Sequence, residues 1–177
     1  MTHIQIGPEM TMEQVLSLAP AAQRALFQRY HVGGCSSCGF QPTDTLAQVC
    51  KDHNILDVQE VVRTILVAQE MDAALQVDPT QVRAWLDAGK DFSLIDVRTP
   101  DEWQIARIEG AELLDYQDSG KYMSLPKDRT IVFACKTGSK SLDVAAYFKG
   151  HGFTNVHSMR GGIEAWAAEV DPAVPRY

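Results

Sequence analysis

Apolar residues recur every three or four positions in the first part of the chain. Between positions 12 and 19 they follow the stretch TMEQ, in which Thr11 and Gln14 have the spacing of a capping box. Pro20 then stands where a second helix can begin, because the first turn of a helix tolerates a residue without an N–H group. This pattern predicts two short helices before residue 31.

Two further helices are expected before residue 75. The stretch TLAQ (residues 45–48) opens one of them and places Cys50 and His53 on its apolar face. The stretch DVQE (residues 57–60) opens the other, whose apolar residues have the most regular spacing in the chain. No strand pattern interrupts these segments, so residues 1–75 predict a small all-α domain.

From residue 78 onward, short apolar runs alternate with helical segments. The expected strands are FSLIDVR (92–98), RTIVFAC (129–135) and FTNVHSM (153–159). The expected helices are DPTQVRAWLDAGK (78–90), SLDVAAYFKG (141–150) and GGIEAWAAEV (161–170), and PDEWQIA (100–106) is expected to form a helical turn or a short helix. Such alternation is typical of α/β domains, so residues 78–177 predict a mostly parallel sheet flanked by helices.

Composition restricts the classes of function. The chain has 177 residues, of which 22% are charged and 45% hydrophobic, and its formal net charge is −7. A net negative charge disfavours binding to nucleic acid or to an anionic membrane surface. No apolar run is long enough to span a bilayer, and the N-terminus MTHIQIGPEM lacks the basic and apolar regions of a signal peptide. We therefore expect a cytoplasmic protein that binds neither membranes nor nucleic acids.

The four cysteines are too few for a disulfide scaffold of this size. In a reducing compartment they are expected to be catalytic, redox-active, metal-binding or simply buried. Cys135 can be interpreted either as a buried structural cysteine or as a functional one. It follows apolar residues, which is typical of a buried structural cysteine, but two lysines and a glycine come directly after it, which favours a functional loop.

The position of Cys135 suggests chemistry. It stands at the carboxyl end of an expected strand, where parallel α/β sheets bind ligands, and a helix is expected to start near Ser141. Inward-facing N–H groups, the helix N-terminus and the two lysines all favour the thiolate over the thiol. We therefore expect Cys135 to be a nucleophile. The candidate anion-binding residues are Lys136, Thr137, Gly138, Ser139 and Lys140.

The second half of the chain resembles the rhodanese domain, the fold of a family of sulfurtransferases. The resemblance covers about residues 78–170 and rests on separate motifs in the family's order. They are LIDVRTPDEW (94–103), IEGA (108–111), CKTGSKS (135–141) and RGGIEAW (160–166). The resemblance implies a rhodanese-like α/β domain in which Cys135 is the nucleophile and the backbone of residues 136–140 cradles an anion.

Loop length and two departures qualify this resemblance. Four residues separate Cys135 from Lys140, the short form associated with sulfur transfer, whereas related phosphatases and arsenate reductases have one residue more. The family usually has arginine where Lys140 stands, and lysine keeps the charge but loses the planar fork. Ala106 and Arg107 replace the usual Gly-His before IEGA, which affects a structural turn more than the chemistry.

Asp96 and Arg98 belong to the first of these motifs. We expect them to form a buried pair that ties loops together, without a catalytic role. With Ser141 they are expected to surround the residues that touch substrate. Trp103 and Trp166 are expected in the core.

A second candidate site is the glycine-rich stretch HVGGCSSCGF, in which Cys35 and Cys38 have Cys-x-x-Cys spacing. The pair can close a disulfide, or take sulfur from a persulfide and resolve it. With His31, Cys50 and His53 it also has the spacing of a tetrahedral zinc site. The structural alternative is two idle thiols in a turn, a buried Cys50 and a packed or capping His53. We favour a redox pair without a metal.

Residues 5–68 also resemble the small helical domains known as hybrid-cluster-protein-associated disulfide domains. The resemblance rests on MTMEQVL (10–16), on a cysteine pair after an aromatic-containing helix, and on TLAQVCKDHNI (45–55). It implies redox chemistry at Cys35 and Cys38 and nothing further.

Together these patterns predict a sulfurtransferase with two domains, residues 1–75 and 78–177. Cys135 would take sulfane sulfur from thiosulfate or a persulfide and pass it to a thiol or a protein acceptor, which requires no metal and no organic cofactor. The alternatives are a phosphatase or arsenate reductase, and a sulfur-carrier or interaction module without turnover.

Overall fold

The computed structural model describes residues 4–33, 39–117 and 119–177, and divides the chain into two compact units, residues 1–74 and 75–177. Cys35 and Cys38 lie outside the described residues. None of the helices in the described parts of the chain is both long enough and apolar enough to cross a bilayer.

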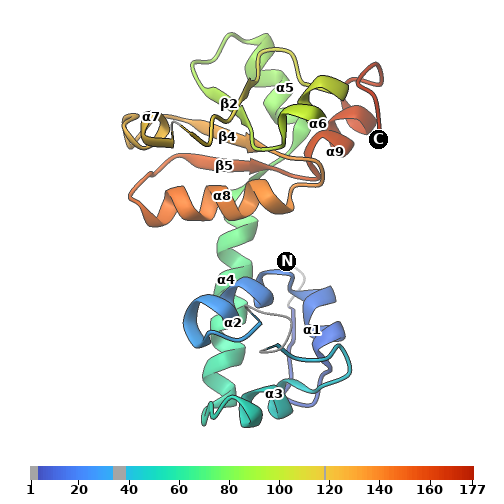
Figure 1. The fold of residues 1–177 in the computed structure, drawn as a ribbon, viewed down its shortest axis with the longest axis vertical. Helices are drawn as coiled ribbons and strands as arrows, with labels where there is room; N and C mark the ends of the chain where they lie inside the picture. Colours follow the sequence, from blue (N-terminus) through green and yellow to red (C-terminus); the bar gives the residue numbers. More distant parts are fainter. Residues whose placement is uncertain (1–3, 34–38, 118) are drawn as a thin grey trace. The chain divides into compact units, whose positions relative to one another are not determined.

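The first unit is helical, as the sequence predicts (Figure 1). Thr11 caps the first helix: its Oγ1 accepts from the N–H of Gln14 at 3.4 Å, and its own N–H donates to Gln14 Oε1 at 3.0 Å, so the predicted capping box is confirmed. Thr45 caps the third helix through the N–H of Gln48 at 3.2 Å. The helices are α1 (Met12–Leu18), α2 (Ala21–Tyr30), α3 (Leu46–Asp52) and α4 (Val58–Leu75).

The N-termini of α1 and α3 satisfy each other. The N–H of Met12, at the start of α1, donates to the carbonyl of Asp44 at 2.8 Å, just before α3. In return the N–H of Leu46 donates to the carbonyl of Met10 at 2.9 Å. The first N–H groups of a helix have no partner within it, and here each helix finds acceptors in the segment that leads into the other.

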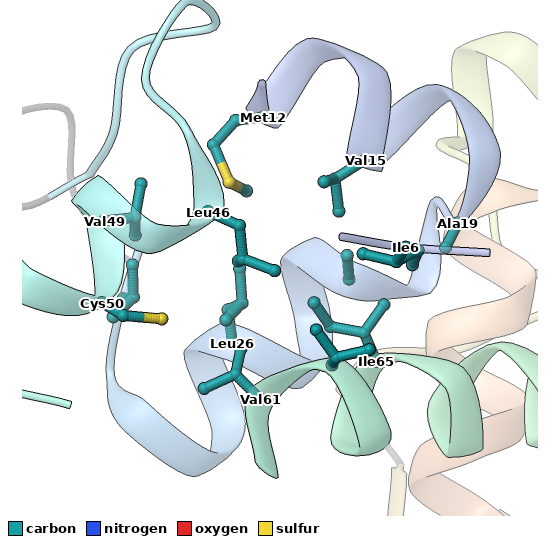
Figure 2. Packing of buried hydrophobic residues seen from close by; sticks show 13 residues of the cluster. Ile6, Met12, Val15, Ala19, Leu26, Leu46, Val49, Cys50, Val61 and Ile65 are labelled. Carbon is teal, nitrogen blue, oxygen red and sulfur yellow. The ribbon is translucent and has the colours of Figure 1, made fainter. Parts of the chain in front are cut away.

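The core of the first unit forms where the apolar faces of these helices meet (Figure 2). Met12, Leu26 and Ile65 are fully buried there, and Cys50 lies among them with its side chain in the same cluster. The position of Cys50 agrees with its interpretation as a small buried hydrophobe. His53 does not share that environment, because α3 ends at Asp52 and His53 is its half-buried C-cap.

The second unit is built on a sheet of parallel strands, as predicted. Within residues 75–117 and 119–177 the sheet has five strands in the order β1-β5-β4-β2-β3, and each neighbouring pair is parallel. The strands are β1 (Gln76–Val77), β2 (Ser93–Asp96), β3 (Glu112–Leu113), β4 (Ile131–Ala134) and β5 (Val156–Met159). The sequence patterns predict β2, β4 and β5 but not the edge strands, because two residues cannot show a period.

Helices cover both faces of this sheet (Figure 1). Along β4, Ile131, Phe133 and then Cys135 pack into the core on the α8 side, whereas Val132 and Ala134 pack on the side of α5 and α9. The helices are α5 (Pro79–Asp87), α6 (Pro100–Ile105), α7 (Ser119–Met123), α8 (Ser139–Gly150) and α9 (Gly162–Glu169). The side chain of Cys135 therefore faces α8.

Three details of the second unit differ from the sequence predictions. Helix α8 begins at Ser139, two residues before the expected start near Ser141, because Gly138 adopts a left-handed φ of 91° and serves as its N-cap. Helix α7 was not expected, since its five residues carry little periodicity. Trp166 lies in the core as expected. Trp103 is only half-buried, and no other residue of α6 is buried either.

His157 on β5 should make the stability of the protein depend on pH. Burial, followed by the charges of Lys90 and Lys149, lowers the pKa of His157 below its ordinary value. As the pH falls below about 6.5, the unfolded chain takes up this proton before the folded one does, so folded stability is lost on acidification. We expect His157→Gln to flatten the fall in unfolding free energy between about pH 7.5 and pH 5.5, measured by denaturant titration. An unchanged slope would contradict this assignment, and His151→Gln, at an exposed histidine, is the control.

Candidate active site

Cys135 lies directly after β4, where its sulfur is surrounded by donors from the start of α8. Its Sγ accepts from the N–H of Gly138 at 3.1 Å and from the N–H of Ser141 at 3.4 Å. The hydroxyl of Ser141 lies 3.3 Å from the same sulfur. The residue is 2% exposed, so these donors replace most of the water that would otherwise solvate a thiolate. Ser141, expected near the site, thus contacts the sulfur itself.

The backbone of the loop has further donors to offer. Within the described residues, no protein acceptor is bonded to the N–H groups of Lys136, Thr137, Ser139 and Lys140. The last two begin α8, whose first N–H groups have no partner inside the helix. A loop that combines free N–H groups with a helix N-terminus suits an anion.

The two lysines of the loop have different surroundings. Lys140 is exposed in the first turn of α8, and no carboxylate of the described residues forms an ion pair with it. The ammonium of Lys136 lies 4.0 Å from the carboxylate of Glu164 and 4.4 Å from the ring centroid of Tyr177. The charge of Lys140 is therefore available to a ligand, while that of Lys136 is already held by neighbours.

A buried pair of serines continues inward from the sulfur. The hydroxyl of Ser141 lies 2.9 Å from that of Ser158, which belongs to β5. Both serines are at most 1% exposed, and the carbonyl oxygen of Gly138 also lies within hydrogen-bonding distance of both hydroxyls, at 3.2 and 3.4 Å. Ser158 was not expected at the site, although its place near the carboxyl end of an apolar strand is where parallel sheets bind ligands.

The loop is clamped by the first turn of α9. The carbonyl of Cys135 accepts from the N–H of Ile163 at 2.8 Å, and that of Lys136 accepts from the N–H of Glu164 at 3.1 Å. Gly162 has a φ of +59°, and a Cβ placed there would lie 2.2 Å from the carbonyl oxygen of Cys135. The second glycine of the fourth motif, Gly162, is thus required because the two backbones touch there.

Asp96 and Arg98 form the buried pair that was expected. Arg98 Nη2 lies 2.7 Å from Asp96 Oδ2, and both side chains are 1% exposed. The same guanidinium donates to the carbonyl of Ala106 at 2.6 Å and to the hydroxyl of Tyr177 at 2.6 Å. It ties β2, the end of α6 and the C-terminal segment together, and Ala106 takes part through its backbone, so its side chain does not enter this contact.

Tyr116 is a neighbour of the site that the sequence analysis missed. Its hydroxyl donates to the carbonyl of Val97 at 2.7 Å, and the N–H of Val97 donates in turn to Ala134, the residue before Cys135. Burial of the hydroxyl, then the charges of Asp96 and Cys135, raise the pKa of Tyr116. The residue as a whole is 63% exposed, so its ring is accessible beside the Cys135 loop.

The rhodanese-like domain family matches residues 78–169, just over half of the chain, including Cys135 and the glycines that clamp its loop. The chain belongs to the rhodanese-like family. The match covers the second unit, and the helical unit lies outside it.

Curated relatives of this family match the same part of the chain. The probable adenylyltransferase/sulfurtransferase MoeZ of Mycobacterium tuberculosis is 42% identical over 104 residues, which are 57% of this chain but only 26% of that protein. A sulfurtransferase of Allochromatium vinosum is 35% identical over 100 residues, 56% of this chain and 94% of the relative. The thiosulfate sulfurtransferase GlpE of Pseudomonas aeruginosa is 30% identical over 96 residues, 54% of this chain and 86% of the relative.

Of the three cysteines of the helical unit, only Cys50 lies among the described residues. Burial raises the pKa of the Cys50 thiol, so it stays protonated and unreactive at neutral pH. Cys35 and Cys38, the predicted redox pair, lie outside the described residues, so their role stays a prediction. Within residues 4–33, 39–117 and 119–177, no three His, Cys, Asp or Glu side chains come together as a metal site.

Gly162→Ala should displace the Cys135 loop. Its Cβ would collide with the carbonyl oxygens of Cys135 at 2.2 Å and Lys136 at 2.5 Å, on backbone of positive φ. We expect a loss of at least about 2 kcal/mol of unfolding free energy beyond the cost of the φ angle itself. We also expect a large change in the rate at which iodoacetamide alkylates Cys135.

Gly152→Ala is the matched control for this substitution. Gly152 also has a positive φ, of +88°, but nothing lies within 4 Å of an added Cβ. The variant should therefore lose only about 1–2 kcal/mol of unfolding free energy, the cost of a left-handed conformation for alanine. The alkylation rate of Cys135 should stay unchanged. Equal losses for the two variants would show that contact with the loop is not what Gly162 provides.

Proposed function

We propose that the protein is a rhodanese-type sulfurtransferase that carries sulfane sulfur on Cys135. The observation that supports this most strongly is the sulfur of Cys135 at the N-terminus of α8, bonded to the N–H groups of Gly138 and Ser141. A loop of this kind stabilises a sulfur anion through fixed backbone dipoles. The sulfurtransferase names of relatives in this family support the same activity.

The reaction we propose has two transfers. The Cys135 thiolate attacks the outer sulfur of thiosulfate, the sulfur–sulfur bond of the donor breaks, and sulfite leaves with the bonding electrons. With a low-molecular-weight persulfide as donor, a thiolate leaves instead. Cys135 then carries a persulfide. An acceptor thiolate attacks the outer sulfur, forms a new persulfide and returns the Cys135 thiolate, so neither an external oxidant nor a reductant is needed.

The loop has a role in each transfer. The free N–H groups of Lys136, Thr137, Ser139 and Lys140 can bind the anionic donor and then the terminal sulfur of the persulfide. The hydroxyl of Ser141, 3.3 Å from Sγ and backed by Ser158, can donate to the thiolate when it is regenerated. The exposed ammonium of Lys140 supplies a full positive charge where the donor arrives. Metal and organic cofactors are not part of the proposed chemistry.

A phosphatase or arsenate reductase would use the same cysteine. The loop from Cys135 to Lys140 has four intervening residues, which gives a narrower ring of N–H groups than those enzymes use for a tetrahedral oxyanion. Sulfur transfer is therefore the better fit to this loop. Phosphate release from p-nitrophenyl phosphate, if comparable in rate to sulfur transfer, would reverse the choice.

For the domain division and for Cys35 and Cys38, the proposal rests mainly on the sequence. We take residues 1–75 and 78–177 as separate domains, and the compact units 1–74 and 75–177 support this division. Within the first, Cys35 and Cys38 are proposed as a redox pair on the basis of their spacing and of the resemblance to disulfide domains. A cytoplasmic location, a thiol or protein acceptor, and the absence of nucleic-acid partners stay predictions.

Cys135→Ser should abolish sulfur loading while leaving the fold intact, because a serine hydroxyl is a far weaker nucleophile than a thiolate and fits the same space. We expect the wild-type protein to gain the mass of one sulfur atom after incubation with thiosulfate or glutathione persulfide, on the peptide that contains Cys135. The variant should gain none on that position, and its thermal unfolding should stay close to that of the wild type. Sulfur found mainly on Cys35, Cys38 or Cys50 would sink the assignment.

Lys140→Ala should weaken binding of an anionic donor. Loss of the exposed ammonium at the mouth of the loop is expected to raise the KM for thiosulfate about tenfold, equivalent to ~1.4 kcal/mol. Lys140→Arg, which retains the charge, should keep KM within about threefold of the wild type. Lys149→Ala, in the last turn of the same helix, is the control for general charge, and an equal KM change there would argue against a local role.

A further inference from the structure

Tyr177 is fixed by a buried ion pair although it lies in the C-terminal segment. Its hydroxyl accepts from Arg98 Nη1 at 2.6 Å, and Arg98 is held by Asp96 with both side chains 1% exposed. The same hydroxyl donates to Glu102 Oε1 at 3.1 Å. Burial is the main cause that raises the pKa of Tyr177, so the phenol keeps the proton that this second bond requires. Both partners are polar groups at the carboxyl end of β2 and the start of α6.

The other end of Tyr177 meets the active-site loop. The ammonium of Lys136 lies 4.4 Å from the centroid of its ring, and the guanidinium carbon of Arg98 lies 5.8 Å from the same centroid. On its other side Lys136 has the carboxylate of Glu164 at 4.0 Å, while its backbone carbonyl is bonded to the N–H of Glu164. Lys136, the residue directly after Cys135, is therefore held both at its backbone carbonyl and at its ammonium group.

We propose that Tyr177 is a positioning residue that holds the Lys136 ammonium at the rim of the Cys135 loop, as a fixed positive charge for an anionic sulfur donor. The inference deepens the proposed sulfur transfer and rests on it. It assigns a role to Tyr177 that the sequence did not suggest, and it separates the two lysines by function: Lys140 is free to meet the donor, and Lys136 is set in place beforehand.

The physical reason is the flexibility of lysine. A free lysine side chain samples many rotamers, and holding its ammonium near a ligand loses that freedom. A ring beneath the charge, itself fixed at its hydroxyl, and a carboxylate beside it restrict the ammonium before the donor binds. Binding of an anion then requires less ordering, so the gain should appear in donor affinity rather than in the chemical step.

The opposite effect is also testable. If Tyr177 and Glu164 instead kept the ammonium away from the donor, removing the ring would release Lys136 and strengthen donor binding. The two interpretations therefore predict KM changes of opposite sign, and the sign decides between them.

The first experiment measures steady-state sulfur transfer from thiosulfate to cyanide. We expect Tyr177→Ala to raise the KM for thiosulfate about two- to fivefold, the range for a cation–π contact at a partly exposed site, with kcat within about 1.5-fold of the wild type. Tyr177→Phe keeps the ring but loses the hydrogen bonds of the hydroxyl, so its KM should lie between those of the wild type and Tyr177→Ala. Tyr147→Ala, at an exposed tyrosine of α8, is the matched control. An unchanged or lowered KM in Tyr177→Ala overturns the proposal.

A double-mutant cycle separates positioning from general loosening of the fold. Lys136→Met removes the charge and keeps most of the length of the side chain. If Tyr177 acts through Lys136, adding Tyr177→Ala to Lys136→Met should not raise KM further. A KM increase of the same size in both backgrounds would mean that Tyr177 acts through the fold alone, and the proposal would be wrong.

A second readout does not depend on sulfur transfer. Alkylation of Cys135 by anionic iodoacetate, divided by its alkylation by neutral iodoacetamide, reports the positive charge held near the sulfur. We expect this ratio, followed by peptide mapping, to fall about two- to fivefold in Tyr177→Ala and in Lys136→Met, and not in Tyr147→Ala. If the wild type forms no Cys135 persulfide but the ratio falls as expected, the sulfurtransferase assignment fails and the positioning role stands. If persulfide forms and the ratio is unchanged, the positioning role fails alone.

Discussion

The backbone of the Cys135 loop lies against the backbone of the first turn of α9, and the site depends on that contact. The carbonyls of Cys135 and Lys136 accept from the N–H groups of Ile163 and Glu164, while four N–H groups of the loop have no acceptor among the residues that the structure describes. The contact needs glycine at positions 138 and 162, because a Cβ at either would lie within 3 Å of the facing backbone. The same hydrogen bonds that satisfy the start of α9 thus shape the anion cradle at the start of α8.

Much of this arrangement could be predicted from the sequence, because it depends on local rules. The cap at Thr11, the strand that ends before Cys135 and the pairing of Asp96 with Arg98 all follow from residue type and spacing. The contacts of Ser158 and Tyr177 with the loop do not, since each contact forms only after β5 and the C-terminal segment have been placed in three dimensions, although the strand-end position of Ser158 is suggestive. The edge strands β1 and β3 could not be predicted for another reason: each has only two residues, too few to show an alternating pattern.

Cys50 and Cys135 show how far environment decides the chemistry of a thiol. Both are nearly inaccessible, and both follow apolar residues in sequence. Cys50 lies on a helix face among aliphatic side chains, where burial favours the neutral form. Cys135 has hydrogen-bond donors from two N–H groups and a hydroxyl around its sulfur. Burial therefore does not distinguish a structural cysteine from a nucleophile in this chain, whereas the polarity of the surrounding groups does.

The mutual capping of α1 and α3 has a consequence for how the helical unit folds. Each of these helices has seven residues, too few to be stable alone in water. Beyond the local caps of Thr11 and Thr45, the first N–H group of each helix is bonded to the segment before the other, so we expect the two helices to form together. The two helices lie on either side of α2 in the sequence, so bringing their N-termini together closes the chain between them, and the entropy lost in that closure is expected to add to the barrier to folding.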